Sequence, residues 1–414
     1  MGQSLAHIAS ALDEAVDDRA GHAFAFLGDL VRAASVLGGE LEAQELVAAE
    51  LERLGFATRM LTVPDDIAER DGAGVPRLAY DDRPVVVGER AGSGRSLLLN
   101  GHVDVVPPGA RPAWHGDPFE PVVRDGWLLG RGAGDMKGGF AMALLALEAV
   151  LEVAPSSARG PVSFVSAIEE ECTGNGTLAA VRAGVVADAA LLPEPTGLEL
   201  LLEGIGILWF ELVVSGRPTH AQDPGAGANA IELALPLISG LRELEREANA
   251  AGGRHALNVG TFRGGDWQSS VPGEATIGVR LGFPRAWSVA EAEARVRAAV
   301  ARAAESDPWL ARNPPRLRFN GFRAEGYALD RRHPLAEAVA AAHRDVLGTE
   351  PAVSAGTATT DARYYVNQAG IPALCYGPRA RNIHGIDEAV ELESIVVGAR
   401  VLARFLLRYL GEEA

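Results

Sequence analysis

The chain has 414 residues, and its 38 Lys and Arg residues against 55 Asp and Glu residues give a net charge of −17. This acidic balance disfavours a nucleic-acid or anionic-membrane partner, because phosphate binding needs clustered positive charge. With 48% hydrophobic and 22% charged residues, the composition is that of a globular protein and excludes a mainly disordered chain. No run of about 18 apolar residues occurs, so we expect no membrane span.

The first 200 residues predict an α/β domain. Apolar positions at helical spacing indicate two helices between about residues 5 and 54. Short apolar runs then alternate with Gly-rich turns and helical segments, the runs lying at 96–99, 162–168, 189–192 and, late in the chain, 372–376. This alternation is typical of a largely parallel sheet that helices cover on both faces.

Residues 205–321 follow a different order: strand, helix, strand, strand, helix, strand. This βαββαβ order is typical of a ferredoxin-like unit and is complete in itself. The α/β pattern then resumes with predicted helices near 334–347 and 391–410. We therefore expect one larger domain formed by residues 1–204 and 322–414, with residues 205–321 inserted as a second domain.

Histidines and carboxylates follow the apolar runs of the larger domain, at His102, Asp104, Glu169–Glu171, Glu194 and His384. In open α/β sheets the loops beyond the carboxyl ends of the strands converge on one crevice. Several carboxylates in one crevice repel one another unless a cation neutralises them, so the pattern indicates a metal site. Imidazole and carboxylate ligands suit zinc, and also cobalt or manganese.

Two residues near these runs have predicted supporting roles. Asp135 ends a Gly-rich loop where a helix begins, from which it could bridge two ions. The spacing of His102 and Asp104 places both side chains on one side of an extended segment, where Asp104 would hold the imidazole. Glu171 is expected to point away from the site. The segment Gly130-Arg-Gly-Ala-Gly could be mistaken for a dinucleotide-binding turn, but Asp135 stands at the place of its third glycine.

Eight short motifs of the chain occur in an order that resembles one known group of enzymes. They are Gly101-His-Val-Asp-Val-Val-Pro107, Gly130-Arg-Gly-Ala-Gly-Asp-Met-Lys-Gly138, Ala167-Ile-Glu-Glu-Glu171, Glu194-Pro-Thr196, Ser215-Gly-Arg-Pro-Thr-His-Ala221, Asn258-Val-Gly260, Ser270-Val-Pro272 and Asn382-Ile-His-Gly385. Together they resemble the cocatalytic-metal deacylases and peptidases, which include acetylornithine deacetylase, succinyl-diaminopimelate desuccinylase, aminoacylase and glutamate carboxypeptidase. The resemblance spans nearly the whole chain, the insertion included.

The resemblance implies a site with two zinc ions. Asp135 would bridge the ions, His102 and Glu194 would complete the ligands of one, and Glu170 and His384 those of the other. Glu169 would act as general base, taking a proton from the attacking water and passing it to the leaving amine.

The resemblance also implies roles for the inserted domain, which would be a lid and a dimerisation domain. His220 would reach into the active site of a partner subunit and stabilise the oxyanion there. Asn258 and Arg280 would bind a substrate carboxylate, for which an arginine fork is well suited. Gln268-Ser269-Ser270 departs from the paired asparagines of the desuccinylase, so the substrate class stays open.

We therefore predict a cytoplasmic, homodimeric, metal-dependent enzyme that hydrolyses the amide bond of an N-acyl amino acid or a related small amide. The cytoplasmic assignment rests on two cysteines, Cys172 and Cys375, that lie far apart in sequence, and on an N-terminal segment without the pattern of a secretory signal. A dipeptidase or carboxypeptidase with the same two ions is the alternative within the enzymes. An inactive binder of amino-acid derivatives is the alternative from another class.

Overall fold

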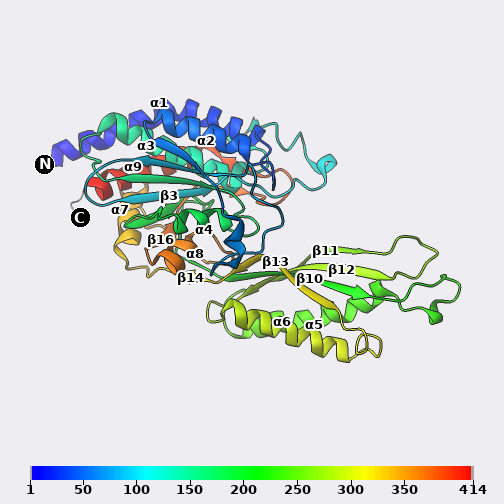
Figure 1. Ribbon diagram of the computed structural model, residues 1–414. Coiled ribbons are helices and arrows are strands. Elements are labelled where there is room, and N and C mark those ends of the chain that lie inside the picture. The colour runs from blue at the N-terminus through cyan, green and yellow to red at the C-terminus, as the bar shows by residue number, and fades with distance from the viewer. Residues whose placement is uncertain (1, 412–414) are drawn as a thin grey trace.

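The computed structural model describes residues 2–411, so that residue 1 and residues 412–414 of the predicted larger domain lie outside it. The chain forms two lobes (Figure 1). The larger one contains both chain ends, and the smaller one is formed by the middle of the sequence. None of the helices in residues 2–411 is both long and apolar enough to cross a membrane. Cys172 and Cys375 are buried and unpaired with each other, and the cytoplasmic location stays a prediction.

The larger domain is built on a mixed sheet with the strand order β1-β2-β6-β3-β7-β16-β8-β15. Its four central strands are β6 (Val162–Ala167), β3 (Leu97–His102), β7 (Ala189–Leu192) and β16 (Ala373–Cys375). They are parallel to one another and coincide with the four predicted apolar runs, so the α/β prediction is confirmed. Two strands at one edge, β1 (Ala57–Leu61) and β2 (Val85–Arg90), are antiparallel and were not predicted.

Helices cover both faces of this sheet (Figure 1). One face carries α1 (Gly2–Arg32), α3 (Gly138–Val153), α7 (Pro334–Leu347) and α9 (Leu392–Gly411), which pack against one another. α2 (Leu41–Arg53) packs against β1 and β2, and α4 (Asn175–Arg182) and α8 (Ala362–Tyr364) lie on the opposite side (Figure 1). Buried side chains of these helices and of the central strands form one continuous apolar core. The burial of apolar surface in this core is the main term that stabilises the domain.

The inserted domain contains the six predicted elements in the predicted order. They are β10 (Gly206–Ser215), α5 (Ala230–Ala250), β11 (Leu257–Gly264), β12 (Glu274–Phe283), α6 (Val289–Glu305) and β13 (Arg316–Ala324). The strand order β11-β12-β10-β13 is antiparallel throughout. Leu208, Phe210 and Leu281 point to the side of α5 and α6 and form a separate core with them. The predicted return to the larger domain at residue 322 falls inside β13.

Short strands complete the fold around the site. A four-stranded sheet has the order β17-β18-β5-β4, and β14 pairs with β9 where the chain passes between the domains. The bounds of the short strands are β4 (Val122–Arg124), β5 (Trp127–Leu129), β8 (Leu200–Leu201), β9 (Glu203–Gly204), β14 (Tyr327–Ala328), β15 (Val353–Ser354), β17 (Ala380–Arg381) and β18 (Ala389–Glu391). Main-chain groups of Val75 and Gly321 exchange two hydrogen bonds of 2.8 and 2.9 Å, which join the two domains directly.

Candidate active site

The parallel strands bring most of the predicted site residues to one end of the sheet. His102 is the last residue of β3, and Glu194 follows β7 by two residues. Glu170 and Glu171 lie in the turn after β6, and His384 lies in the loop after β17. Since β6, β3 and β7 are adjacent and parallel, their carboxyl ends and the following side chains share one crevice.

Asp135 lies between two imidazole rings. Its Oδ1 is 3.3 Å from His102 Nε2 and its Oδ2 is 3.5 Å from His384 Nε2. His384 Nε2 is also 3.0 Å from Glu171 Oε1. One ligand atom from each of His102, Asp135 and Glu171 falls within a 4.8 Å group that could hold a metal ion. Each oxygen of Asp135 therefore faces a different imidazole, the arrangement that a bridging carboxylate needs.

The Gly-rich loop before Asp135 is held in place by Glu388. Glu388 Oε1 accepts hydrogen bonds from the main-chain N–H groups of Gly134 and Asp135, at 3.0 and 2.9 Å. Glu388 is itself paired with the buried guanidinium of Arg131. Both side chains are buried, so this pair fixes the loop from behind. Sequence reasoning missed Glu388, because it lies more than 250 residues from the loop that it holds.

Of the three consecutive glutamates, Glu170 faces the cavity as predicted, but the orientations predicted for Glu169 and Glu171 are wrong. Glu169 does not face the site: its carboxylate is buried and accepts hydrogen bonds from Tyr80 Oη, Arg83 Nη1 and Thr173 Oγ1 at 2.8, 2.8 and 2.6 Å. Glu171, which was expected to point away, contacts His384. The prediction assumed an extended strand end, but β6 stops at Ala167 and Glu169 has a φ of +62°. A left-handed residue changes the chain direction and reverses the expected alternation of side chains.

Asp104 has a different contact from the predicted one. Its Oδ1 and Oδ2 accept hydrogen bonds of 3.1 Å from the main-chain N–H groups of Glu170 and Glu171. The carboxylate lies 3.6 Å from His102 Nδ1, but that nitrogen is hydrogen-bonded to the main-chain carbonyl of Asp104 at 2.9 Å. Because a carbonyl only accepts, Nδ1 carries a proton, and Nε2 is the ring nitrogen that faces Asp135 and could bind a metal ion. Asp104 thus holds the glutamate turn with its side chain and the imidazole with its main chain.

The electrostatics of the cluster indicate a place for a cation. Burial raises the pKa of Glu194 to about 8 and that of Asp104 to about 7. It also raises the pKa of Glu170 well above its usual value, with further contributions from neighbouring carboxylates. Burial alone would lower the pKa of His384, but Asp135 and Glu171 raise it to about 11. A site of desolvated carboxylates and two imidazoles fits divalent metal ions, which would replace the protons that these groups otherwise retain.

A cavity of about 580 Å³ lies between the cluster and the inserted domain. Asp135, Glu170, Glu171, Glu194 and His384 line it on the side of the larger domain. Arg280, Trp209, Ile207 and Phe322 line it on the side of the inserted domain. The cavity therefore has an acidic wall and a wall that offers donors and apolar surface.

Two predicted site residues lie outside this cavity. Asn258 is opposite Arg280 in the pairing of β11 with β12, but it is exposed and not part of the lining. His220 is exposed on the loop after β10, where its Nδ1 accepts a hydrogen bond of 3.0 Å from the Gln222 N–H. Among the residues that the structure describes, the site thus gathers the predicted metal ligands and Arg280, but neither Asn258 nor His220.

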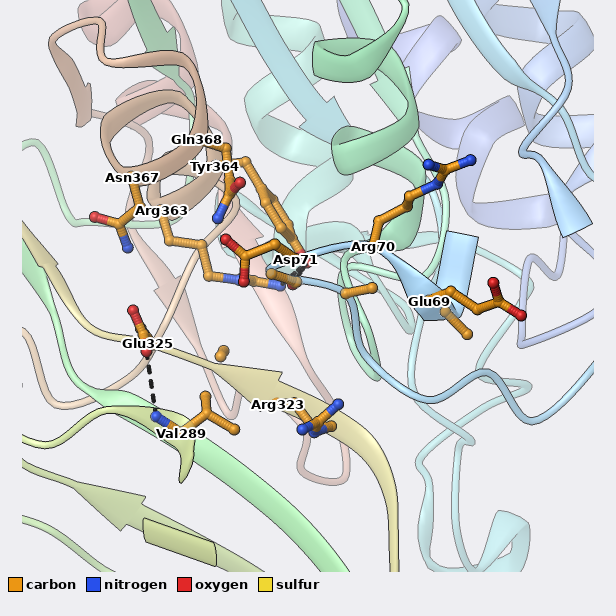
Figure 2. A pocket seen from close by; sticks show the side chains of 14 residues that line it. Glu69, Arg70, Asp71, Val289, Arg323, Glu325, Arg363, Tyr364, Asn367 and Gln368 are labelled. Atoms are coloured by element: carbon orange, nitrogen blue, oxygen red, sulfur yellow. Dashed lines mark hydrogen bonds between the residues drawn. The ribbon is translucent and has the colours of Figure 1, made fainter. Parts of the chain in front are cut away.

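Arg363 is a further site residue that the sequence did not reveal. Its Nη1 lies 3.9 Å from Glu170 Oε1 and 3.5 Å from Asp361 Oδ1. Figure 2 shows the cavity on which Arg363 also borders, which both domains line and which has a volume of about 410 Å³. In the described chain, this second cavity contains none of the predicted site residues. A lone arginine after Asp361 carries no pattern that would distinguish it from a surface residue.

The chain is similar to known proteins over most of its length. The profile of the peptidase family M20/M25/M40 matches residues 98–408. An N-formyl-4-amino-5-aminomethyl-2-methylpyrimidine deformylase of Bacillus subtilis is 30% identical over 360 residues, which are 80% of this chain and 84% of the relative. A succinyl-diaminopimelate desuccinylase of Cupriavidus taiwanensis is 30% identical over 390 residues, 89% of this chain and 94% of that protein. The fold is similar to that of a metallo-carboxypeptidase of Sulfolobus solfataricus, with a TM-score of 0.75, 18% identity, and coverage of 94% and 99% of the two chains.

Proposed function

The chain belongs to the peptidase family M20/M25/M40 and is an enzyme of amide hydrolysis, and from this premise we propose that it releases the acyl group of an N-acyl amino acid or a related small amide. The observation that carries the proposal is the arrangement of Asp135, Glu171 and His384 at one wall of a cavity, with Glu170 beside them and His102 in contact with Asp135. Arg280 enters the same cavity from the inserted domain. Membership of this enzyme family sets aside the inactive binder.

We propose two divalent metal ions, zinc in the first place and cobalt or manganese as alternatives, since imidazole and carboxylate donors suit all three. Asp135 would bridge them, with His102 and Glu194 on one side and Glu171 and His384 on the other. This ligand set replaces Glu170 by Glu171, because Glu171 Oε1 is the carboxylate oxygen 3.0 Å from His384. Such ions supply positive charge that polarises the scissile carbonyl and activates water.

Glu170 takes the role of general base in this proposal. It lines the cavity and its Oε2 lies 3.9 Å from His102 Nε2, so its carboxylate is beside the cluster without being held by His384. Glu170 would take a proton from the attacking water and pass it to the leaving amine. Asp104 supports this step by binding the N–H groups of Glu170 and Glu171, which fixes where both side chains begin. Burial raises the pKa of the Glu170 carboxyl well above its usual value, which makes its carboxylate a stronger proton acceptor.

The inserted domain supplies substrate recognition and, in our proposal, the dimer contact. Arg280 would bind the substrate carboxylate, and Asn258 would approach it from the neighbouring strand when the domain closes. β11 is the edge strand of its sheet and carries the exposed Phe262, with the exposed Trp267 in the next loop. An open edge with exposed aromatic side chains is a surface that a second copy can cover.

His220 would act across that dimer. Since its Nδ1 accepts a hydrogen bond, its proton lies on Nε2, where it could be donated to an oxyanion in the partner's site. His220 is exposed and is not used by its own subunit's cavity. Both features agree with a role outside its own subunit.

The alternative is a dipeptidase or carboxypeptidase with the same ligands, because a peptide bond and an acyl amide need the same chemistry. A screen of metal-reconstituted protein separates the two. N-acetyl, N-succinyl, N-formyl and N-carbamoyl amino acids are compared with dipeptides, and released amine is measured. We expect turnover of N-acyl amino acids, loss of it with a chelator and recovery with Zn²⁺ or Co²⁺. Turnover of dipeptides alone would support the alternative, and full turnover by protein shown to be metal-free would contradict the proposal.

A further inference from the structure

Trp209 lies at a β-bulge in the inserted domain. In the pairing of β10 with β13, Leu208 is opposite Arg323 and Phe210 is opposite Phe319. Trp209 alone therefore faces the three residues 320–322 of the partner strand. Such a bulge redirects a side chain, and bulges are frequent beside active sites. The ring of Trp209 also packs edge-to-face on Phe322, with 5.3 Å between ring centres.

Gly321 makes room for the indole. It has a φ of +58°, and a Cβ added there would lie 2.5 Å from Trp209 Cε3. Gly321 is also the residue that exchanges two main-chain hydrogen bonds with Val75 of the larger domain. A residue with a side chain would clash with the indole and would be strained at this φ. The position of Trp209 is thus fixed from its own strand, from β13 and from the larger domain.

The indole nitrogen has no protein partner. Trp209 Nε1 is buried and, among the described residues, makes no hydrogen bond, and Trp209 lines the cavity of the metal cluster. Buried donors are nearly always paired in folded proteins, and an unpaired donor in a ligand cavity is relieved when a ligand brings an acceptor.

Arg280 provides a second unpaired donor beside the first. Trp209 and Arg280 are direct partners in the pairing of β10 with β12, so their side chains leave the same face of the sheet as neighbours. Arg280 is partly buried, lines the same cavity, and has neither a hydrogen bond nor an ion pair with any described residue. The three fully buried arginines of the described chain, Arg83, Arg131 and Arg363, all lie within 4.0 Å of a carboxylate.

We propose that Trp209 is a specificity-determining residue, whose indole N–H and the guanidinium of Arg280 together bind one carboxylate of the substrate. This inference rests on the proposed hydrolysis of N-acyl amino acids. The opposite wall of the cavity carries Asp135, Glu170, Glu171 and Glu194, which repel an anion. The carboxylate is therefore received at the inserted domain, and the pair selects substrates with a free carboxylate over their carboxamides.

The test separates the N–H group from the ring. Trp209→Phe keeps an aromatic side chain and removes the donor, whereas Trp209→Leu removes both. Each variant is assayed on the best N-acyl amino acid of the screen and on its carboxamide. For Trp209→Phe we expect kcat/KM on the acid to fall about 10- to 100-fold, the usual effect of one hydrogen bond to a charged group, mainly through KM. On the carboxamide we expect a change within about threefold, so that the preference for the acid decreases.

Two controls accompany these variants. Trp309→Phe makes the same change at another indole of the inserted domain, whose N–H donates to the main-chain carbonyl of Ser215 at 2.9 Å and which does not line the cavity, so it should alter neither substrate's kinetics. Arg280→Gln, alone and combined with Trp209→Phe, tests whether the two residues share one carboxylate. If they do, the double variant loses less than the product of the two single losses, because the groups act on the same ligand atoms.

The outcomes distinguish this inference from the function on which it rests. If Trp209→Phe keeps the full preference for the acid and only Trp209→Leu loses activity, the ring is an apolar wall and the inference is wrong. If the wild type turns over no N-acyl amino acid, the proposed function fails, and calorimetric titration with the same compounds decides the inference. Weaker binding to Trp209→Phe than to the wild type would then support it. Equal binding to both proteins, or no binding to either, would overturn it.

Discussion

The two walls of the cavity of about 580 Å³ differ in how their polar groups are satisfied. On the larger domain, Asp135, Glu171, His102 and His384 already contact one another, and Glu388 and Asp104 hold the loops behind them. On the inserted domain, Arg280 and Trp209 Nε1 have no partner among the described residues. Side chains that contact one another keep fixed positions, as metal ligands must. Hydrogen-bond donors without a protein partner can instead bind a substrate.

The largest effects on activity should come from changes in the turn after β6, which carries the proposed general base Glu170 and the proposed metal ligand Glu171. Glu170→Gln should retain its metal and its fold but lose about 10² to 10⁴ in kcat, as expected for a lost general base. Glu171→Gln should lose metal as well, because a neutral amide is a poorer ligand for a divalent cation. Elemental analysis and kinetics of both variants measure the two effects. Glu305→Gln, at an exposed position, is the matched control. Retention of metal by Glu171→Gln with its loss from Glu170→Gln would reverse our assignment.

A slightly smaller loss of kcat is expected from a change at His220, which is exposed and does not line the cavity of its own subunit. His220→Ala should lower kcat about 10²- to 10³-fold, as for one lost oxyanion donor. Co-expression with Glu170→Gln tests whether the residue acts across a dimer. With random pairing about half of the dimers are mixed and one of their two sites is intact, so activity should return to about a quarter of the wild type. Activity that stays at the level of the single variants, in dimers shown to be mixed, would confine His220 to its own subunit.

Glu169 should affect stability rather than chemistry. Glu169→Ala removes the acceptor of the buried donors of Tyr80, Arg83 and Thr173, and each buried donor left unsatisfied costs about 1 to 3 kcal/mol. Glu169→Gln keeps an acceptor for Tyr80 and Thr173 and should cost less, with kcat close to the wild type. Urea denaturation and kinetics of the two variants measure these effects. A Glu169→Gln protein that is fully folded, contains metal and has lost turnover would restore Glu169 as the general base.

The smallest effect is a pH dependence of the metal-free protein. The pKa values of Asp104, Glu194 and His384 in the folded chain are about 7, 8 and 11, all above their ordinary values. Each group therefore holds a proton in the folded protein that the unfolded chain releases, so stability should fall as the pH rises from about 5 to 8. Metal ions replace these protons, and Zn²⁺ should raise Tm more at pH 8 than at pH 6. Equal shifts at both pH values would mean that the protons and the ions do not compete.

The sequence by itself determined the layout of the protein. Apolar runs of strand length, each followed by a histidine or a carboxylate, predicted the parallel strands β3, β6, β7 and β16 and the crevice at their ends. The βαββαβ order predicted the inserted domain. These features follow from local periodicity, which the sequence contains, and from the general rule that parallel strands end at one edge of a sheet.

Only the tertiary structure decided which of the three consecutive glutamates faces the site. Glu169 is turned away from the site by hydrogen bonds from Tyr80 and Arg83, which lie more than 80 residues before it in the sequence. The left-handed conformation of Glu169 also breaks the alternation of side chains on which the prediction relied. The same holds for Trp209, which reads as one aromatic residue in a strand until β13 and Gly321 are placed against it. Side-chain direction outside regular structure depends on backbone dihedrals and on distant partners, and neither is encoded in the spacing of residues along the chain.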